Sequence, residues 1–108
     1  MITVVGGIKG GTGKSTISTN LAAWLAVENQ DVILIDANPG QTTSSNWVSR
    51  RNENLAKIHC VEKSNDLRET LKDFDKRYDQ MPIKTLLIAS SFLQLTYQTH
   101  ESLNLYKI

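Results

Sequence analysis

The chain has 108 residues, a length typical of one domain or of part of one. Hydrophobic residues make up 40% and charged residues 21%, which is ordinary for a globular protein and excludes wholesale disorder. A formal charge of +1 argues against a basic surface for nucleic acid over the whole chain, and a single cysteine excludes an intrachain disulfide framework. The sequence has no apolar run of membrane-spanning length and no signal-peptide pattern, so we expect a cytoplasmic protein without a membrane partner.

Strand and helix patterns alternate from the start of the chain. A short β-branched run at residues 2–6 predicts a buried strand that ends in glycine. A helix is predicted from residue 14 to about residue 28, and its apolar stripe consists of Ile17, Leu21, Trp24 and Leu25. Residues 31–36 then predict a second buried strand, and residues 42–52 predict a helix that contains Trp47.

The same alternation continues further along the chain. Residues 57–62 predict a third strand and residues 85–89 a fourth, with a helix between them. Asp66 and Glu69 have the spacing of a capping box at the start of that helix, whose apolar stripe is Leu67, Leu71, Phe74 and Tyr78. Strands that alternate with helices predict an α/β fold, in which a mainly parallel sheet of about four recognisable strands is covered by helices on both faces.

Most of the charged residues lie within residues 1–79, and few lie in the rest of the chain. We therefore divide it into residues 1–79, which contain most of the charged side chains and the glycine-rich loop, and a divergent C-terminal segment of residues 80–108. Residues 90–108 are ambiguous, although Leu93, Leu95 and Tyr97 alternate as in a strand. The charged residues of the C-terminal segment are Lys84, Glu101 and Lys107.

A glycine-rich loop lies between the first predicted strand and the first predicted helix. Such a loop turns successive backbone N–H groups toward one concavity that binds phosphate oxygens, and the helix N-terminus adds its positive dipole. Lys14 places a cation on the β- and γ-phosphates, and the Ser15 hydroxyl is a ligand for Mg²⁺. The predicted phosphate-binding residues are Lys9, Gly10, Gly11, Thr12, Gly13, Lys14, Ser15 and Thr16.

Residues 9–16 match the deviant Walker A motif K-G-G-x-G-K-[ST]-T, whereas the strict motif fails because Ile8 occupies its first glycine position. With this motif, and with Pro39 near Gln41 and Trp47, the chain resembles the ParA/MinD family of ATPases, more closely the plasmid and chromosome partition branch. The resemblance covers about residues 1–78. It implies a P-loop NTPase-like fold that takes ATP or ADP together with Mg²⁺.

The resemblance also implies roles for two residues that we count as catalytic. Lys9 would reach the partner's phosphates across a nucleotide-dependent homodimer, and the alternative is a solvated loop lysine. Asp36, at the end of the second strand, would hold Mg²⁺ through water together with Ser15, and the alternative is a strand-terminal turn residue. The same resemblance implies nonspecific DNA binding on the bacterial nucleoid and a centromere-binding adaptor protein as partner.

Three departures from the family pattern concern hydrolysis and length. Asn38 stands where the family has a second aspartate, and an amide cannot accept a proton from the attacking water. Ala89 or Ser90 stands where a Walker B strand ends in aspartate, and Gly40 looks like an insertion. The chain is also about half the length of related proteins, which suggests a truncated or frame-shifted family member. We therefore expect nucleotide binding to persist and hydrolysis to be weak or absent.

Two functions follow from these observations. The first is a ParA-type ATP-binding protein of plasmid or chromosome partition, which dimerises with ATP and segregates DNA. The second is a non-catalytic remnant or regulator that binds nucleotide or pairs with a full-length ParA relative. A MinD-like membrane regulator is disfavoured because no basic amphipathic C-terminal helix is visible, and a relative of the nitrogenase iron protein because one cysteine cannot bridge a cluster.

The remaining candidate residues favour structural roles. Two adjacent arginines on a helix end predict a solvated face rather than a DNA contact, and two tryptophans predict core or interface anchors. A cysteine in an apolar strand predicts a small buried hydrophobe, and two histidines lack the spacing of metal ligands. These residues are Arg50, Arg51, Trp24, Trp47, Cys60, His59 and His100.

Overall fold

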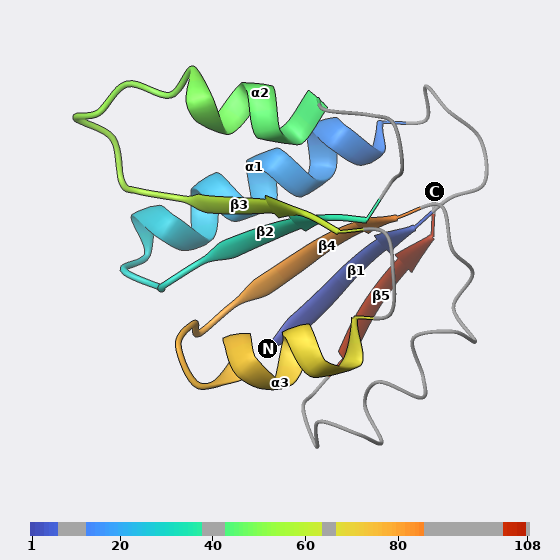
Figure 1. The fold of residues 1–108 in the computed structure, drawn as a ribbon. Coiled ribbons are helices and arrows are strands. Elements are labelled where there is room, and N and C mark those ends of the chain that lie inside the picture. The colour runs from blue at the N-terminus through green and yellow to red at the C-terminus, as the bar shows by residue number, and fades with distance from the viewer. Residues whose placement is uncertain (7–12, 38–42, 64–66, 86–102, 108) are drawn as a thin grey trace.

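The computed structural model describes residues 1–6, 13–37, 43–63, 67–85 and 103–107, and the following account concerns those residues. Five strands form one sheet in the order β3-β2-β4-β1-β5, and every paired neighbour is parallel (Figure 1). The predicted α/β fold with a parallel sheet is confirmed. The elements in chain order are β1 (Ile2–Gly6), α1 (Lys14–Val27), β2 (Ile33–Asp36), α2 (Thr43–Ser49), β3 (His59–Glu62), α3 (Arg68–Asp75), β4 (Met81–Thr85) and β5 (Leu103–Lys107).

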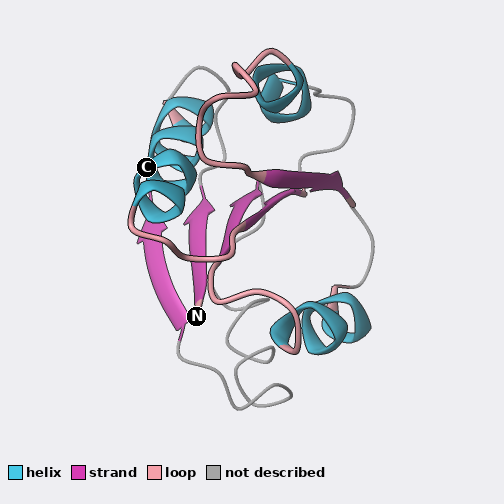
Figure 2. Ribbon diagram, turned by 90° about the vertical axis from the view of Figure 1, so that its left-hand side faces the viewer, coloured by secondary structure: helices cyan, strands magenta, loops and turns pink. Residues whose placement is uncertain are grey.

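Helices cover both faces of the sheet, as the alternation predicted (Figure 2). Successive residues of a strand point to opposite faces, so each buried strand contributes to two cores. On one face Ile33 and Ile35 pack with Leu71 of α3. On the other face Leu34 packs with Ala22 of α1, and α2 contributes partly buried side chains there. Strands β1 and β2 are buried along their whole length, as expected for strands of a parallel sheet that has helices on both faces.

Both ends of α1 are set by residues with a positive φ. Gly13 precedes the helix with φ 91°, in the left-handed region that side chains rarely adopt. After the helix, Asn29 takes φ 63°, and the N–H of Gln30 bonds back to the carbonyl of Leu25. This pattern is a Schellman-type end, which asparagine tolerates better than most residues do. These two residues mark where α1 begins and ends, and the first turn of the helix directly follows the glycine-rich loop.

Two predicted boundaries were wrong. The helix expected to begin with a capping box at Asp66 has Leu67 at its N-cap, without a side-chain capping bond, and Asp66 lies outside the described residues. The fourth strand begins at Met81 instead of Thr85, and residues 86–89 lie outside the described residues. This strand contains Pro82, which lacks the N–H that a ladder needs.

The sheet accommodates Pro82 by interrupting one ladder. Toward β1 the pairing of β4 is continuous, and it includes Thr3 opposite Pro82. Toward β2 only two pairs form, next to an isolated bridge between Val32 and Gln80. The missing N–H therefore falls on the β2 side, where the ladder has a gap. Beyond that gap the strands pair again, and Asp36 lies opposite Lys84.

No helix in the part of the chain that the structure describes is both long and apolar enough to cross a bilayer.

Candidate nucleotide-binding site

The structure describes only part of the predicted phosphate loop. Residues 7–12, which include Lys9, lie outside the described residues, as do Asn38 and Ala89 and the side chain of Ser15. The described members of the predicted site are Gly13, Lys14, Thr16 and Asp36. Of these, Thr16 is exposed, and its carbonyl accepts a hydrogen bond from the side chain of Asn20 at 2.7 Å.

Lys14 is the first residue of α1 and is almost completely buried, with 4% of its surface exposed. Its carbonyl accepts a hydrogen bond of 2.7 Å from the hydroxyl of Ser18, which is also buried. Burial lowers the pKa of Lys14, and the positive charge of Lys84 lowers it further. A buried lysine at a helix N-terminus, with a second cation nearby, is an arrangement that favours a bound anion.

Asp36 is the last residue of β2 and lies at the carboxyl end of the sheet, where parallel α/β folds bind their ligands. Its side chain has the same orientation as that of Leu34, on the face covered by α1. In the neighbouring strand Lys84 lies directly opposite, and Val5 of β1 lies opposite Lys84 on its other side. The sequence prediction that Asp36 ends a strand on the side of the phosphate loop agrees with this geometry.

Lys84 is a member of the site that the sequence analysis did not identify. Its Nζ lies 3.8 Å from Oδ2 of Asp36, and the two side chains are 1% and 0% exposed. At that distance the contact is an ion pair without a hydrogen bond, and Lys84 Nζ has no hydrogen-bond partner among the described residues. The signal in the sequence is a lysine inside an apolar strand, within a segment that has few other charges.

The described residues do not fit a Mg²⁺ ion at Asp36. A carboxylate that binds Mg²⁺, directly or through water, compensates the positive charge of the metal. Here the ammonium of Lys84 already forms an ion pair with that carboxylate. Both side chains are buried and have almost no exposed surface. Within the described residues no group of three or more His, Cys, Asp or Glu side chains forms an alternative metal site.

The residues with predicted structural roles mostly have local partners. The guanidinium of Arg51 donates to the carbonyl of Ala56 at 2.7 Å and lies 5.1 Å from the ring centre of Trp47, whereas Arg50 is exposed. His59 Nδ1 lies 2.6 Å from the hydroxyl of Tyr78, which ties β3 to the segment after α3. Arg51 and His59 therefore have structural contacts within this chain.

Cys60 is half-buried beside the α1 core instead of fully buried. Burial raises the pKa of its thiol to about 11, with further increases from the negative charges of Asp36 and Glu62. Because the thiolate is the reactive form, we expect alkylation by iodoacetamide at pH 8 to be about tenfold or more slower in the folded chain than in urea. Mass spectrometry over time measures both rates, and equal rates would contradict the assignment of an inert thiol.

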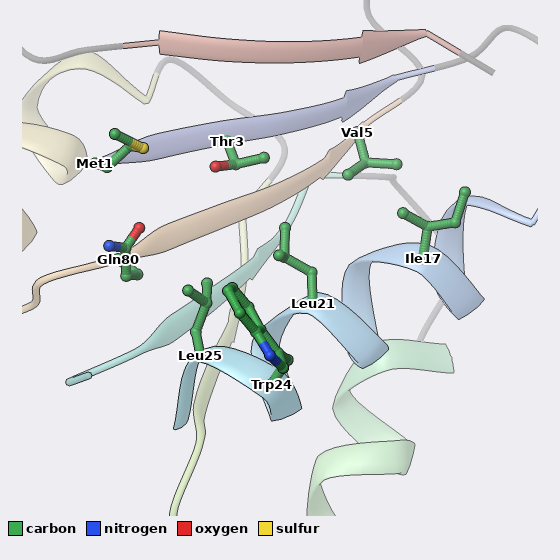
Figure 3. Close-up of a pocket in the computed structure, with 8 residues that line it drawn as sticks. All are labelled: Met1, Thr3, Val5, Ile17, Leu21, Trp24, Leu25 and Gln80. Atoms are coloured by element: carbon green, nitrogen blue, oxygen red, sulfur yellow. The ribbon is translucent and has the colours of Figure 1, made fainter. Parts of the chain in front are cut away.

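An apolar groove of about 480 Å³ lies between α1 and β1 (Figure 3). Leu21 of α1 and Val5 of β1 contribute to its walls. The predicted apolar stripe of α1 is thus only partly covered: Leu25 is buried, but Ile17 is 44% exposed and Trp24 is 61% exposed. Of the two roles predicted for the tryptophans, Trp47 packs against the α1 core, whereas Trp24 lines the groove and is not a core residue, so its role as an interface anchor stays a prediction.

Several solved structures have the same fold. The chain matches the BceF tyrosine kinase domain with a TM-score of 0.66 at 22% identity, covering 96% of this chain and 55% of that one. It matches two structures of FtsY from Mycoplasma mycoides with TM-scores of 0.62 and 0.59, at 21% and 18% identity. These matches cover 92% and 93% of this chain but only 35% and 36% of FtsY. The chain thus spans about half or less of the length of these structures, and the likeness concerns the fold.

Comparison with curated proteins found no significant match. The model of one protein family, however, matches residues 2–103, which include β1 to β4 and the first residue of β5. That family is described as the CobQ/CobB/MinD/ParA nucleotide-binding domain. The match covers nearly the whole chain and agrees with the buried lysine at the start of α1 and with the parallel sheet. The chain therefore belongs to the CobQ/CobB/MinD/ParA nucleotide-binding domain family.

Proposed function

We propose that the chain is a ParA-type ATP-binding protein of plasmid or chromosome partition. The observation that carries this proposal is the position of Lys14, buried at the first turn of α1 directly after the left-handed Gly13, in a chain with the deviant Walker A motif. In this proposal ATP binding drives dimerisation through Lys9. The dimer then binds DNA nonspecifically and responds to a centromere-binding adaptor protein. The two regions 1–79 and 80–108 remain our division of the chain.

A second candidate function is a non-catalytic regulator that binds nucleotide or pairs with a full-length ParA relative. The specific observation in its favour is the ion pair between Lys84 and Asp36, since it engages the carboxylate that family resemblance assigns to Mg²⁺. Asn38 in place of an aspartate points in the same direction. The two candidates differ in whether the chain forms its own ATP-dependent dimer.

Nucleotide binding tests what both candidates share. Replacing Lys14 with alanine is expected to weaken ATP binding at least tenfold, because a charge-assisted contact in a partly dry site contributes about 1.5–3 kcal/mol. Isothermal titration calorimetry of the parent and of Lys14→Ala measures the change. Lys57→Ala, which removes an exposed lysine away from the loop, is the matched control and should bind like the parent. Equal affinities for the parent and Lys14→Ala would remove the nucleotide assignment.

ATP-dependent dimerisation separates the two candidates. With a non-hydrolysable ATP analogue the parent is expected to sediment as a dimer and Lys9→Ala as a monomer, because Lys9 neutralises phosphate charge across a two-fold interface. Analytical ultracentrifugation with and without the analogue measures this, again with Lys57→Ala as the control. A parent that binds the analogue and stays monomeric would favour the regulator.

A further inference from the structure

One face of α1 is exposed although it is largely apolar. Ile17, Trp24 and Val27 on this helix are 44%, 61% and 70% exposed. Together with the exposed Asn20 they follow intervals of three, four and three residues, the spacing that aligns side chains along one side of a helix pair. We call the face formed by these four residues the α1 seam.

The sequence of α1 has no charged side chain after Lys14, although charged residues make up 21% of the chain. A helix with one face in water ordinarily carries charges on that face. In a contact between two identical chains related by a twofold axis, the same patch meets itself, so a charge on the patch would face its own copy. An uncharged seam avoids this repulsion and therefore suits a second copy of this chain better than a charged partner.

The apolar groove of about 480 Å³ opens directly beside the seam. Figure 3 shows Leu21, Trp24 and Leu25 along its α1 side and Thr3 and Val5 along its β1 side. A large exposed side chain and an apolar hollow thus lie next to each other on one face. Such a face complements itself, because a twofold axis puts the exposed group of each copy opposite the hollow of the other. Tryptophan is also among the residue types most enriched at the energetic centres of interfaces.

We propose that the α1 seam and the groove form a contact between two copies of this chain, in which Trp24 of each copy enters the groove of the other. The contact needs no nucleotide and is separate from the ATP-dependent dimer through Lys9, so it does not rest on the proposed function.

The exposed area of the seam sets the strength of this contact. Trp24 is its largest residue and offers only 61% of the roughly 150–250 Å² that a tryptophan can bury. The three other seam residues are smaller, so the seam falls short of the roughly 800 Å² per partner of a standard stable interface. We therefore expect a weak, reversible dimer with a dissociation constant of about 0.1 mM.

Sedimentation equilibrium without nucleotide, from about 10 µM to about 1 mM chain, tests the proposal. The mean mass of the parent is expected to rise from the 12.1 kDa of the monomer toward twice that value. Trp24→Ala should associate at least tenfold more weakly, because the groove of each copy then stays unfilled. Leu55→Ala removes an exposed apolar side chain outside the seam and the groove, and as the matched control it should associate like the parent. A parent that stays monomeric at about 1 mM, or a Trp24→Ala variant that associates like the parent, would overturn the proposal.

Opposite charges at Asn20 test the twofold geometry. Asn20 is exposed near the middle of the seam, where the twofold axis passes in this proposal. Asn20→Lys and Asn20→Glu each bring like charges together, so each is expected to associate at least tenfold more weakly than the parent at low salt. An equimolar mixture of the two variants should associate at least as well as the parent, and circular dichroism checks that each variant is folded. A mixture as weak as the separate variants would contradict a contact between two copies of the seam.

Lys9→Ala distinguishes this contact from the ATP-dependent dimer. Without nucleotide this variant should associate like the parent, whereas loss of association would place the contact at the phosphate loop and overturn the proposal. At about 10 µM the nucleotide-free chain is expected to be mostly monomeric, so ATP-dependent dimerisation is measured at that concentration. Failure of the ATP-dependent dimer, with nucleotide-free association intact, would overturn only the ATP-driven step of the proposed function.

Discussion

Replacing Lys84 with methionine is expected to lower the free energy of unfolding by about 3–5 kcal/mol, because the substitution leaves the buried carboxylate of Asp36 without its cation. Methionine approximates the volume of the lysine stem, so little of this loss comes from a cavity. Urea denaturation followed by circular dichroism measures the change.

The control for this prediction is the double variant Asp36→Asn, Lys84→Met, which removes both charges. It is expected to recover most of the stability that the single variant loses, since neutral groups of similar size have a smaller desolvation cost. Lys57→Met, at an exposed position, should remain within about 0.5 kcal/mol of the parent. A loss below about 1 kcal/mol for Lys84→Met would be typical of a solvated pair and would contradict the burial of this one.

The order of strands and helices could be predicted because the strands are apolar on both faces. Runs such as residues 2–6 and 31–36 have no polar side, which is typical of strands covered by helices on both sides. The sequence also predicted that Lys14 and Asp36 lie at the same end of the sheet. Lys14 follows the glycine-rich loop after the first strand, and Asp36 ends the second strand. Local patterns were sufficient for these elements, whereas the fourth strand begins before its predicted start and β5 was not predicted.

Strand pairing was beyond the reach of the same reasoning. Whether Lys84 lies opposite Asp36 depends on the strand order β2-β4-β1 and on a register that differs between alternatives by single residues. Pro82 further obscured β4, since a central strand with proline is rare and becomes possible only because its missing N–H coincides with a ladder gap. The ion pair is thus a property of the tertiary structure that no sequence window contains.

The apolar stripe of α1 shows a different limit. The spacing of its apolar residues correctly predicts a helix, but it does not predict which of these side chains are buried against the sheet. Leu25 reaches the core, whereas Trp24 and Ile17 line a groove and stay exposed. Burial along the stripe therefore depends on tertiary neighbours that the spacing does not specify.

Hydrolysis of ATP by the parent is expected to be negligible. Phosphoryl transfer depends almost entirely on positioning and electrostatics, and Asn38 and Ala89 stand where the family pattern has carboxylates. Loss of a well-placed general base alone typically lowers a rate by about 10²–10⁴. Steady-state release of phosphate, measured with Mg²⁺ and DNA present, gives the parent rate, and Lys14→Ala gives the background.

The reverse substitution Asn38→Asp shows which departure limits the rate. An increase over the parent would show that the remaining site is competent and that the amide is the main defect, because only the carboxylate can accept the proton of the attacking water. An Asn38→Asp variant as slow as the parent would place the defect at the Walker B position, or at Asp36, which Lys84 engages. Parent turnover of about one per minute or faster, abolished by Lys14→Ala, would contradict the importance of these departures, since an intact catalytic set would then have to reside elsewhere in the chain.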